Sequence, residues 1–287
     1  MRSVLMVGTG LIGASVGLAL KAWGFAGEIA GWDVSGVELA EAQRRGAIDR
    51  ALESREAVLE TDADVVVLAT PVMPILDWME RLAPRLKPTQ LVTDVGSTKG
   101  EIAALAGRLF GRPGRAAFLP GHPMAGKESG GAVLAEAMLF QSAVWLFTPP
   151  TQQVELANAW REAVKGFGAR VREIDPQQHD EVCAWVSHLP QMVSTAMSAL
   201  LVDQFSGDEE AMAAVQAIGG RALREITRLG GSPYSMWRDI ALTNSEAIAA
   251  VLWALEQRLA YVRENLRTPE LREEFSRANR FRLAPRG

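Results

Sequence analysis

The chain of 287 residues has a single cysteine, Cys183, and only three histidines. One cysteine excludes an intrachain disulfide and a cysteine cluster around a metal, and the histidines lack the spacing of a metal site, so we expect no metal. A lone cysteine also fits a reducing compartment, and no apolar run reaches about 20 residues. We therefore expect a soluble, cytoplasmic protein.

The chain has no excess of positive charge, because its 34 acidic residues outnumber its 30 lysines and arginines, and no block of basic residues stands out. A protein that binds nucleic acid or an anionic membrane surface usually carries such a block. We therefore expect neither of these partners.

A glycine pattern near residue 10 is the most informative feature that is present. An apolar stretch at 4–7 predicts a buried strand, and G-T-G-L-I-G follows at 8–13. In G-x-G-x-x-G the glycines allow a tight turn, the approach of a pyrophosphate and close packing of the next helix, here predicted over 11–22. The alternative is a glycine-rich turn inside a packed core. The residues predicted to contact a dinucleotide are Gly8, Gly10, Leu11, Ile12 and Gly13.

Asp33 follows a second predicted strand, 28–32, and bears on the choice of cofactor. A carboxylate at this place accepts hydrogen bonds from a ribose 2′-hydroxyl and repels a 2′-phosphate, which predicts NAD rather than NADP. The alternative is an acid at the start of the next helix. Ser35 and Glu38 already provide a capping box for that helix.

Strand and helix patterns alternate along the first 175 residues. Further strands are predicted over 64–70, 90–94, 118–120, 143–147 and 171–174, and helices over 36–45, 73–86 and 98–110. Thr98 and Glu101 have the spacing of a capping box for the last helix. The alternation predicts an α/β domain over 1–175 with a Rossmann-like, doubly wound parallel sheet.

Strand signals almost vanish after residue 175. Long helices are predicted over 177–205, 208–229 and 234–265, with a short one near 269–279 and a frayed tail after Arg280. The sequence therefore predicts an all-helical domain over 176–287. Helices this long in a small domain can bury their apolar faces against a second copy, so we expect a homodimer.

Three polar clusters follow predicted strands, where ligands bind in open α/β sheets. They are Thr70-Pro71, D-V-G-S-T-K at 94–99 and G-H-P-M-A-G at 121–126. We expect Thr70, Pro71 and Asp94 on the cofactor side.

His122 lies in the third cluster, on a turn that the following proline stiffens. A histidine beside a nicotinamide can act as a general base because its pKa lies near neutrality; a structural role is the alternative. His179, at the start of a helix, is expected at the surface. Arg224 and Arg228 share one helix face, either as part of an exposed ion-pair face or as a clamp for an anion.

Seven motifs, in this order and spacing, resemble the prephenate/arogenate dehydrogenase family over nearly the whole chain. They are G-T-G-L-I-G-A-S, A-T-P, T-D-V-G-S-T-K, G-H-P-M-A-G-K-E-S-G, V-S-H-L-P-Q, T-R-L and M-W-R-D-I. The resemblance implies an NAD-binding Rossmann-like domain and a helical dimerisation domain.

The resemblance also implies roles for individual residues. His122 would hydrogen-bond the 4-hydroxyl of the substrate and assist its deprotonation, and Ser97 would contact the same hydroxyl. His188, Gln191 and Arg228 would bind the substrate, with Arg228 holding a carboxylate. The implied pocket-gating acids are Glu128 and Glu225. Lys127 departs from the family pattern and would place an extra cation beside the pocket.

The implied activity is oxidative decarboxylation of prephenate to 4-hydroxyphenylpyruvate with NAD, a step of tyrosine biosynthesis. Arogenate oxidation to tyrosine and a dual-substrate cyclohexadienyl dehydrogenase are the close alternatives. A reductase of similar build that uses a lysine is disfavoured, because residues 176–279 contain no lysine. A nucleotide-sensing protein without catalysis is the remaining alternative.

Overall fold

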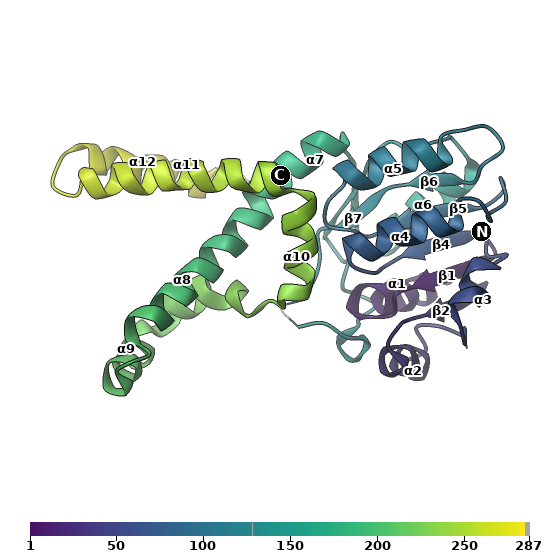
Figure 1. Cartoon of the computed structure of the whole chain (residues 1–287), viewed down its shortest axis with the longest axis horizontal. Coiled ribbons are helices and arrows are strands. Elements are labelled where there is room, and N and C mark those ends of the chain that lie inside the picture. The colour runs from purple at the N-terminus through teal and green to yellow at the C-terminus, as the bar shows by residue number, and fades with distance from the viewer. Residues whose placement is uncertain (128, 285–287) are drawn as a thin grey trace.

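The structure, a computed structural model, describes residues 1–127 and 129–284 (Figure 1). An α/β part holds the strands that the structure describes, the last of which ends at Glu173. The helical part that follows sends two helical hairpins away from the sheet (Figure 1). This arrangement confirms the predicted fold class, an α/β domain with a parallel sheet followed by a helical domain.

The main sheet has six parallel strands in the order β3-β2-β1-β4-β5-β6. They are β1 Ser3–Val7, β2 Glu28–Trp32, β3 Arg50–Ala51, β4 Val65–Leu68, β5 Leu91–Asp94 and β6 Ala117–Leu119. All but β3 fall within or next to strands predicted from the sequence. The order reverses between β1 and β4, and their carboxyl ends form the crevice where such sheets bind ligands.

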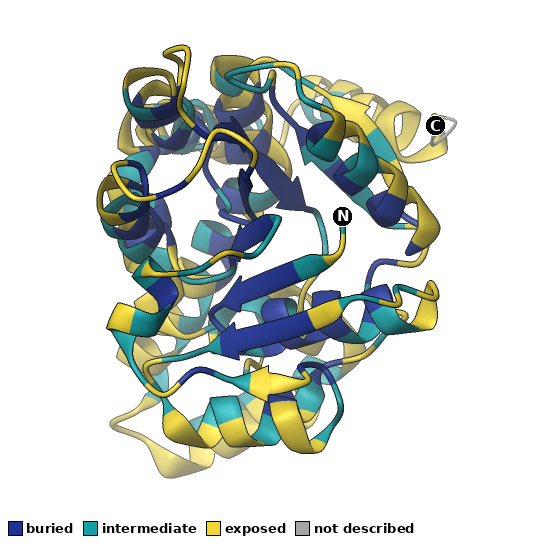
Figure 2. Ribbon diagram, turned by 90° about the vertical axis from the view of Figure 1, so that its right-hand side faces the viewer, coloured by how far each residue is buried: buried dark blue, intermediate teal, exposed yellow. Residues whose placement is uncertain are grey.

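Helices cover both faces of this sheet, whose strands are mostly buried except for the short edge strand β3 (Figure 2). They are α1 Leu11–Ala22, α2 Gly36–Arg44, α3 Arg55–Leu59, α4 Val72–Leu82, α5 Gly100–Phe110 and α6 Glu155–Gly166. Side chains alternate along a strand, so Val4 and Met6 of β1 pack with α1, α2 and α6, and Leu5 and Val7 pack with α3, α4 and α5. Each fully buried side chain of this size contributes about 1.5–3 kcal/mol, which holds the crevice on a rigid frame.

A second, three-stranded sheet lies beside the first, in the order β7-β8-β9. It consists of β7 Gly121–Pro123, β8 Val144–Phe147 and β9 Arg170–Glu173. The prediction of a stiff turn at His122 is therefore wrong, because this residue pairs with Leu146 in an antiparallel edge strand. Pro123 fits there since an edge strand leaves one side of its backbone unpaired.

The helical part consists of α7 Pro176–Cys183, α8 Leu189–Phe205, α9 Glu209–Thr227, α10 Tyr234–Thr243, α11 Ser245–Glu264 and α12 Glu270–Leu283. The helix predicted over 177–205 contains a π-helical turn, Ala184–His188, between α7 and α8. The helix predicted over 234–265 is split at Asn244, whose side chain donates to the carbonyl of Asp180. The tail predicted to fray after Arg280 is helical as far as Leu283, and residues 285–287 lie outside the described residues.

The capping box predicted at Thr98 is wrong. Helix α5 begins at Gly100, and the amides of Lys99 and Gly100 donate to the carboxylate of Asp180 on α7, at 2.7 and 2.8 Å. The Thr98 hydroxyl lies 2.7 Å from that of Thr243 instead. A carboxylate from the helical part thus occupies the positive end of α5.

Helix α4 is held in the same way. The amide of Met73 in its first turn donates to the buried carboxylate of Asp239 on α10, at 3.0 Å. Two acids of the helical part therefore bind the N-terminal ends of two neighbouring helices that cover the same face of the sheet. These contacts set the position of the helical part over the sheet.

Helices α8 and α9 form one hairpin, and α11 and α12 form the other (Figure 1). Both hairpins carry many exposed apolar side chains. Helices α9 and α12 have no buried residue at all in this single chain. The large apolar residues exposed along the hairpins include Leu200, Val202, Ile218, Ile226, Trp253, Leu259, Tyr261, Leu266, Phe275, Phe281 and Leu283. Among the described helices, none has both the length and the apolar character that crossing a membrane requires.

Candidate active site

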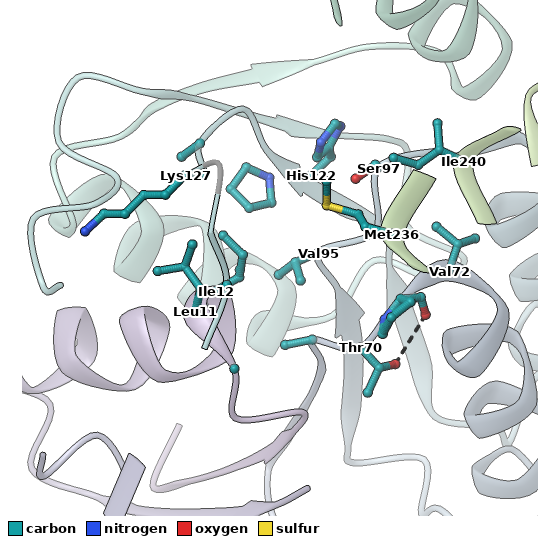
Figure 3. A pocket seen from close by; sticks show the side chains of 18 of the residues that line it. Leu11, Ile12, Thr70, Val72, Val95, Ser97, His122, Lys127, Met236 and Ile240 are labelled. Atoms are coloured by element: carbon teal, nitrogen blue, oxygen red, sulfur yellow. Dashed lines mark hydrogen bonds between the residues drawn. The ribbon is translucent and has the colours of Figure 1, made fainter. Parts of the chain in front are cut away.

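Two adjoining cavities lie where the helical part meets the sheet. The first, of about 330 Å³, opens beside the glycine turn, and the second, of about 390 Å³, opens toward α8 and α10. Ser97, His122 and Met236 line both cavities, so these side chains stand at their junction (Figure 3). The first cavity is also lined by five of the predicted cofactor residues, Gly10, Leu11, Ile12, Thr70 and Pro71.

The glycine turn leaves room for an anion at the start of α1. Gly10 is the N-cap residue of α1, and it has no side chain that could make a capping hydrogen bond. A Cβ added to Gly10 would meet no atom within 4 Å. A Cβ on Gly13 would lie 1.9 Å from the carbonyl oxygen of Gly8, which itself has a φ of 95°. Gly8 and Gly13 therefore shape the turn, while Gly10 leaves space for a pyrophosphate before the helix N-terminus.

Asp33 lies next to this turn but does not line the cavity. Its carboxylate accepts hydrogen bonds from the amides of Thr9, at 2.6 Å, and Ser35, at 2.8 Å. Ser35 caps α2 by accepting from the amide of Glu38, which is one half of the predicted capping box. The other half is absent, because the Ser35 amide donates to Asp33 and the Glu38 carboxylate accepts from the amide of Ala132. These hydrogen bonds, with a longer one of 3.4 Å from the Thr9 hydroxyl, orient the carboxylate of Asp33 and leave it further lone pairs for a ribose hydroxyl.

Asp94, predicted on the cofactor side, faces the protein interior. One carboxylate oxygen accepts from the amide of Gly121, at 3.1 Å, and the other accepts from that of Gly96, at 2.8 Å. The second oxygen also pairs with the ammonium of Lys99, and neither side chain of this ion pair is exposed. Asp94 thus ties β5 to β7 behind the cavity.

The base candidate His122 belongs to a chain of buried hydrogen bonds that the sequence did not predict. Its Nδ1 lies 2.9 Å from Nε2 of His179, whose Nδ1 lies 2.7 Å from a carboxylate oxygen of Asp180. The prediction of a surface position for His179 is wrong, because the residue is fully buried. The adjacent H-D pair at 179–180 was its one signal in the sequence.

The surroundings keep these histidines neutral. Burial, then the neighbouring His179 and the Lys99 ammonium, hold the pKa of His122 well below its usual range. Burial likewise lowers the pKa of His179, although its hydrogen bond to Asp180 opposes the shift. A neutral imidazole at pH 7 is ready to accept a proton.

A thiol lies beside the two imidazoles. Nε2 of His179 is 3.6 Å from the sulfur of Cys183, and donor atoms of His122, His179 and Cys183 all lie within 4.8 Å of one another. A metal ion could use donors with this spacing. Burial raises the pKa of the Cys183 thiol to about 12. The 2.9 Å contact between Nδ1 of His122 and Nε2 of His179 is a hydrogen bond.

Residues of the helical part line the second cavity. Arg228, at the start of a 3₁₀ turn, and Gln191 of α8 line it together with Ser97 and His122. The amide of Gln191 donates to the carbonyl of Leu229, at 2.7 Å, and so holds this turn against α8. An imidazole from the α/β part and a guanidinium from the helical part therefore line one cavity.

Other predicted residues lie elsewhere. His188 is buried behind the residues that line the second cavity, and its Nδ1 lies 3.2 Å from the side-chain amide of Asn244. Its ring packs against that of Trp237, which lines this cavity. Burial lowers the pKa of His188 to about 4. Of the arginine pair, Arg224 lines neither cavity, and Glu225 pairs with Arg221 on the exposed face of α9.

Lys127 does not present its charge to the cavities that it lines. Its ammonium donates to the carbonyl of Leu134 and pairs with Glu136, and Figure 3 shows the side chain extending away from His122. An extra cation beside the substrate is therefore not supplied by this conformation. Glu128, the other predicted gating acid, lies outside the described residues.

Comparison with known proteins agrees with this geometry. The model of the prephenate dehydrogenase nucleotide-binding domain matches residues 16–173, and that of the prephenate dehydrogenase dimerization domain matches residues 175–279. The chain belongs to the prephenate dehydrogenase family. The resemblance inferred from the motifs is thereby confirmed.

Individual members of the family are similar over most of the chain. The prephenate dehydrogenase of Bacillus subtilis is 35% identical over 86% of this chain, which spans just under two thirds (65%) of that relative's length. The structure of the Aquifex aeolicus prephenate dehydrogenase with hydroxyphenyl propionate and NAD⁺ has a TM-score of 0.89 at 28% identity, covering 99% of this chain and 98% of that one. The structure of the Synechocystis arogenate dehydrogenase has a TM-score of 0.77 at 31% identity, covering 98% and 99%.

Proposed function

We propose that this chain catalyses the NAD-dependent oxidative decarboxylation of prephenate to 4-hydroxyphenylpyruvate. The observation that carries the proposal is the junction of the two cavities, where Ser97 and His122 stand between the glycine turn and Arg228. A cofactor in the first cavity and a substrate in the second would meet at these two side chains. The Aquifex relative, whose structure holds NAD⁺ and hydroxyphenyl propionate, supports this assignment.

The first cavity fits NAD. The amides at the start of α1 and the space above Gly10 would take the pyrophosphate, and Asp33 would accept from the ribose 2′-hydroxyl and disfavour NADP. Thr70 and Pro71 would line the path toward the nicotinamide. When bound, NAD⁺ supplies the acceptor for the hydride that leaves the carbinol carbon.

His122 would act as the general base. It takes the proton of the 4-hydroxyl as the carbinol carbon loses hydride, and Ser97 orients the same hydroxyl by a hydrogen bond. The ring then has a ketone para to the carbon that bears a carboxylate, so the C–C bond breaks, CO₂ leaves and its electron pair makes the ring aromatic. The proton returns from His122 to the oxygen, which gives the phenol without net release of a proton.

Arg228 would hold a carboxylate of the substrate. Guanidinium binds carboxylate with two parallel hydrogen bonds, and prephenate carries two carboxylates. Arogenate has an ammonium where prephenate has a ketone. No aspartate or glutamate is found among the described residues that line the two cavities, and this supports prephenate as the preferred substrate.

The direct test follows NAD reduction with prephenate and with arogenate, using NAD and NADP in turn. We expect the highest kcat/KM with prephenate and NAD, and 4-hydroxyphenylpyruvate and CO₂ as products. His122→Ala should lower kcat by about 10²–10⁴-fold while NAD still binds. A protein that binds NAD but oxidises neither substrate would refute the enzyme assignment in favour of a nucleotide sensor.

We also propose that the chain divides into a nucleotide-binding domain, 1–175, and a helical domain, 176–287, that forms a homodimer. The exposed apolar residues of the two hairpins support a partner there, as does the match to the dimerization domain model. Light scattering should give about twice the chain mass of 31.1 kDa. A mass near one chain at micromolar concentration contradicts the homodimer.

A further inference from the structure

The hydrogen bonds behind His122 bear on which of its ring nitrogens carries the proton, as well as on the position of the ring. We propose that His179, oriented by Asp180, holds the proton of neutral His122 on Nδ1, so that Nε2 is the nitrogen that accepts the substrate proton. The inference rests on the proposed function, in which His122 is the base. His179 is then a positioning residue, since it acts on the substrate only through His122.

The argument begins at Asp180, whose carboxylate can only accept hydrogen bonds. It accepts from the amides of Lys99 and Gly100 at the start of α5, where a helix end favours the ionised form. Its hydrogen bonds, above all that with His179, lower the pKa of this carboxyl against the effect of burial. The third hydrogen bond, at 2.7 Å, must therefore be donated by Nδ1 of His179.

The second step concerns the other nitrogen of His179. The ring is fully buried with its pKa lowered, and a neutral imidazole has a single N–H. Since that proton is on Nδ1, Nε2 carries only a lone pair, and it lies 2.9 Å from Nδ1 of His122. Nδ1 of His122 must donate, because two lone pairs would repel at this distance.

The third step leads to the cavity. A neutral His122 that is protonated on Nδ1 has a bare Nε2, and His122 lines both cavities. The opposite tautomer would present an N–H donor to the substrate hydroxyl and could not take its proton. Once Nε2 is protonated, the hydrogen bond from Nδ1 to His179 remains, and the negative charge of Asp180 stabilises the cation through it.

Other charged groups nearby do not provide an alternative acceptor for Nδ1. Lys99 is a donor paired with Asp94, and the thiol of Cys183, with a pKa of about 12, is a weak donor 3.6 Å from the same Nε2 of His179. Helix α5 begins at this cluster, α7 carries Asp180 and Cys183, and the π-helical turn carries His188. The titratable groups that shift the pKa values of the histidine pair are Asp94, Lys99, Asp180 and His188. The thiol of Cys183 only contacts His179.

Nuclear magnetic resonance tests the tautomer directly on the full chain. Long-range ¹H–¹⁵N spectra of protein labelled in histidine separate the two neutral tautomers and the cation, and only three histidines need assignment. His122→Gln identifies the signals of that residue by their loss. We expect a neutral ring with its proton on Nδ1, and a proton on Nε2 would overturn the proposal whatever the enzyme's substrate is.

Kinetics test the consequence. His179→Gln places an amide oxygen near the position of Nε2 and should keep most of the wild-type kcat, whereas His179→Leu removes the acceptor and should lower kcat by about 10–100-fold. In His179→Leu the acid limb of the kcat/KM profile should move to lower pH, because protonated His122 loses the acceptor through which Asp180 stabilises it. Cys183→Ala, a change in the same cluster, should leave kcat and the pH profile unchanged.

The outcomes separate the two proposals. Equal kcat and pH profiles for wild type and His179→Leu would overturn the positioning role, with the dehydrogenase assignment intact. A wild-type protein without activity, or His122→Ala with full activity, would refute the proposed function instead. The Kd for NAD should be the same in all these variants, which shows that each one has folded.

Discussion

The buried pair of Lys99 and Asp94 gives the most demanding prediction for stability. Both side chains are fully buried, and the carboxylate also accepts hydrogen bonds from Gly96 and Gly121. Lys99→Met removes the ammonium and leaves a buried carboxylate without its cation, which costs about 3–5 kcal/mol. At about 2–4 °C per kcal/mol, the unfolding midpoint should fall by roughly 6–20 °C.

Removal of the other partner has a different dependence on pH. In Asp94→Asn the ammonium of Lys99 loses the group that most raises its pKa, while burial already lowers that pKa below the usual 10.5. The unfolded chain then binds more protons than the folded one at alkaline pH, so stability rises with pH. The deficit of Asp94→Asn against wild type should therefore shrink between pH 7 and pH 10, and that of Lys99→Met should not.

Urea unfolding followed by tryptophan fluorescence at both pH values measures these free energies. The double variant Asp94→Asn/Lys99→Met should be less destabilised than the sum of the single variants, by at least about 1 kcal/mol, because the residues are in contact. A Lys99→Met protein within about 0.5 kcal/mol of wild type would refute the reasoning. The reasoning would also be refuted if the losses of unfolding free energy in the two single variants added up to the loss in the double variant. The folded double variant should still bind NAD, and a loss of NAD affinity would restore Asp94 as a cofactor contact.

Three further predictions concern the two cavities and the buried wall behind them. Gly10→Ala should fold normally but weaken NAD binding by about tenfold or more, because the added methyl group occupies free space that the pyrophosphate needs. Gly13→Ala should lose about 1–3 kcal/mol of stability, since its Cβ would lie 1.9 Å from a carbonyl oxygen. Calorimetric titration with NAD and urea unfolding distinguish the two effects. Arg228→Ala should lower kcat/KM for prephenate by about 10–150-fold through the loss of a charged hydrogen bond, whereas Arg224→Ala, which lines neither cavity, should match wild type in the same assay. His188, with a pKa of about 4 in the folded protein and 6.5 in the unfolded chain, should cost about 3 kcal/mol of stability as pH falls from 6.5 to 4, and urea midpoints that are flat over this range would contradict the shift.

Local signals predicted the α/β part well. The glycine turn, the buried V-V-V-L strand and the Ser35 cap each depend on neighbours within a few residues, and the structure has all three. The family resemblance also placed Arg228 and Gln191, which line the cavity with His122. Periodicity, however, did not place the π-helical turn before α8 or the break at Asn244.

Contacts between distant parts of the chain account for the predictions that were wrong. The sequence suggested that Thr98 caps α5, but Asp180, about 80 residues away, binds the same amides with a full negative charge. His179 was expected at the surface because it follows a helix-starting proline, yet that helix end packs against the cluster around Lys99. A motif describes only what a residue can bond, and packing selects the partner.

The sequence by itself determined that a dinucleotide-binding sheet is followed by a helical domain, because glycine turns and apolar periodicity are properties of short segments. Only the tertiary structure decided how the two parts meet: which carboxylates cap which helices, and which ring nitrogen of His122 is turned toward His179. Those choices join residues 57 to 166 positions apart, and they depend on the burial and hydrogen bonding of the folded chain as a whole.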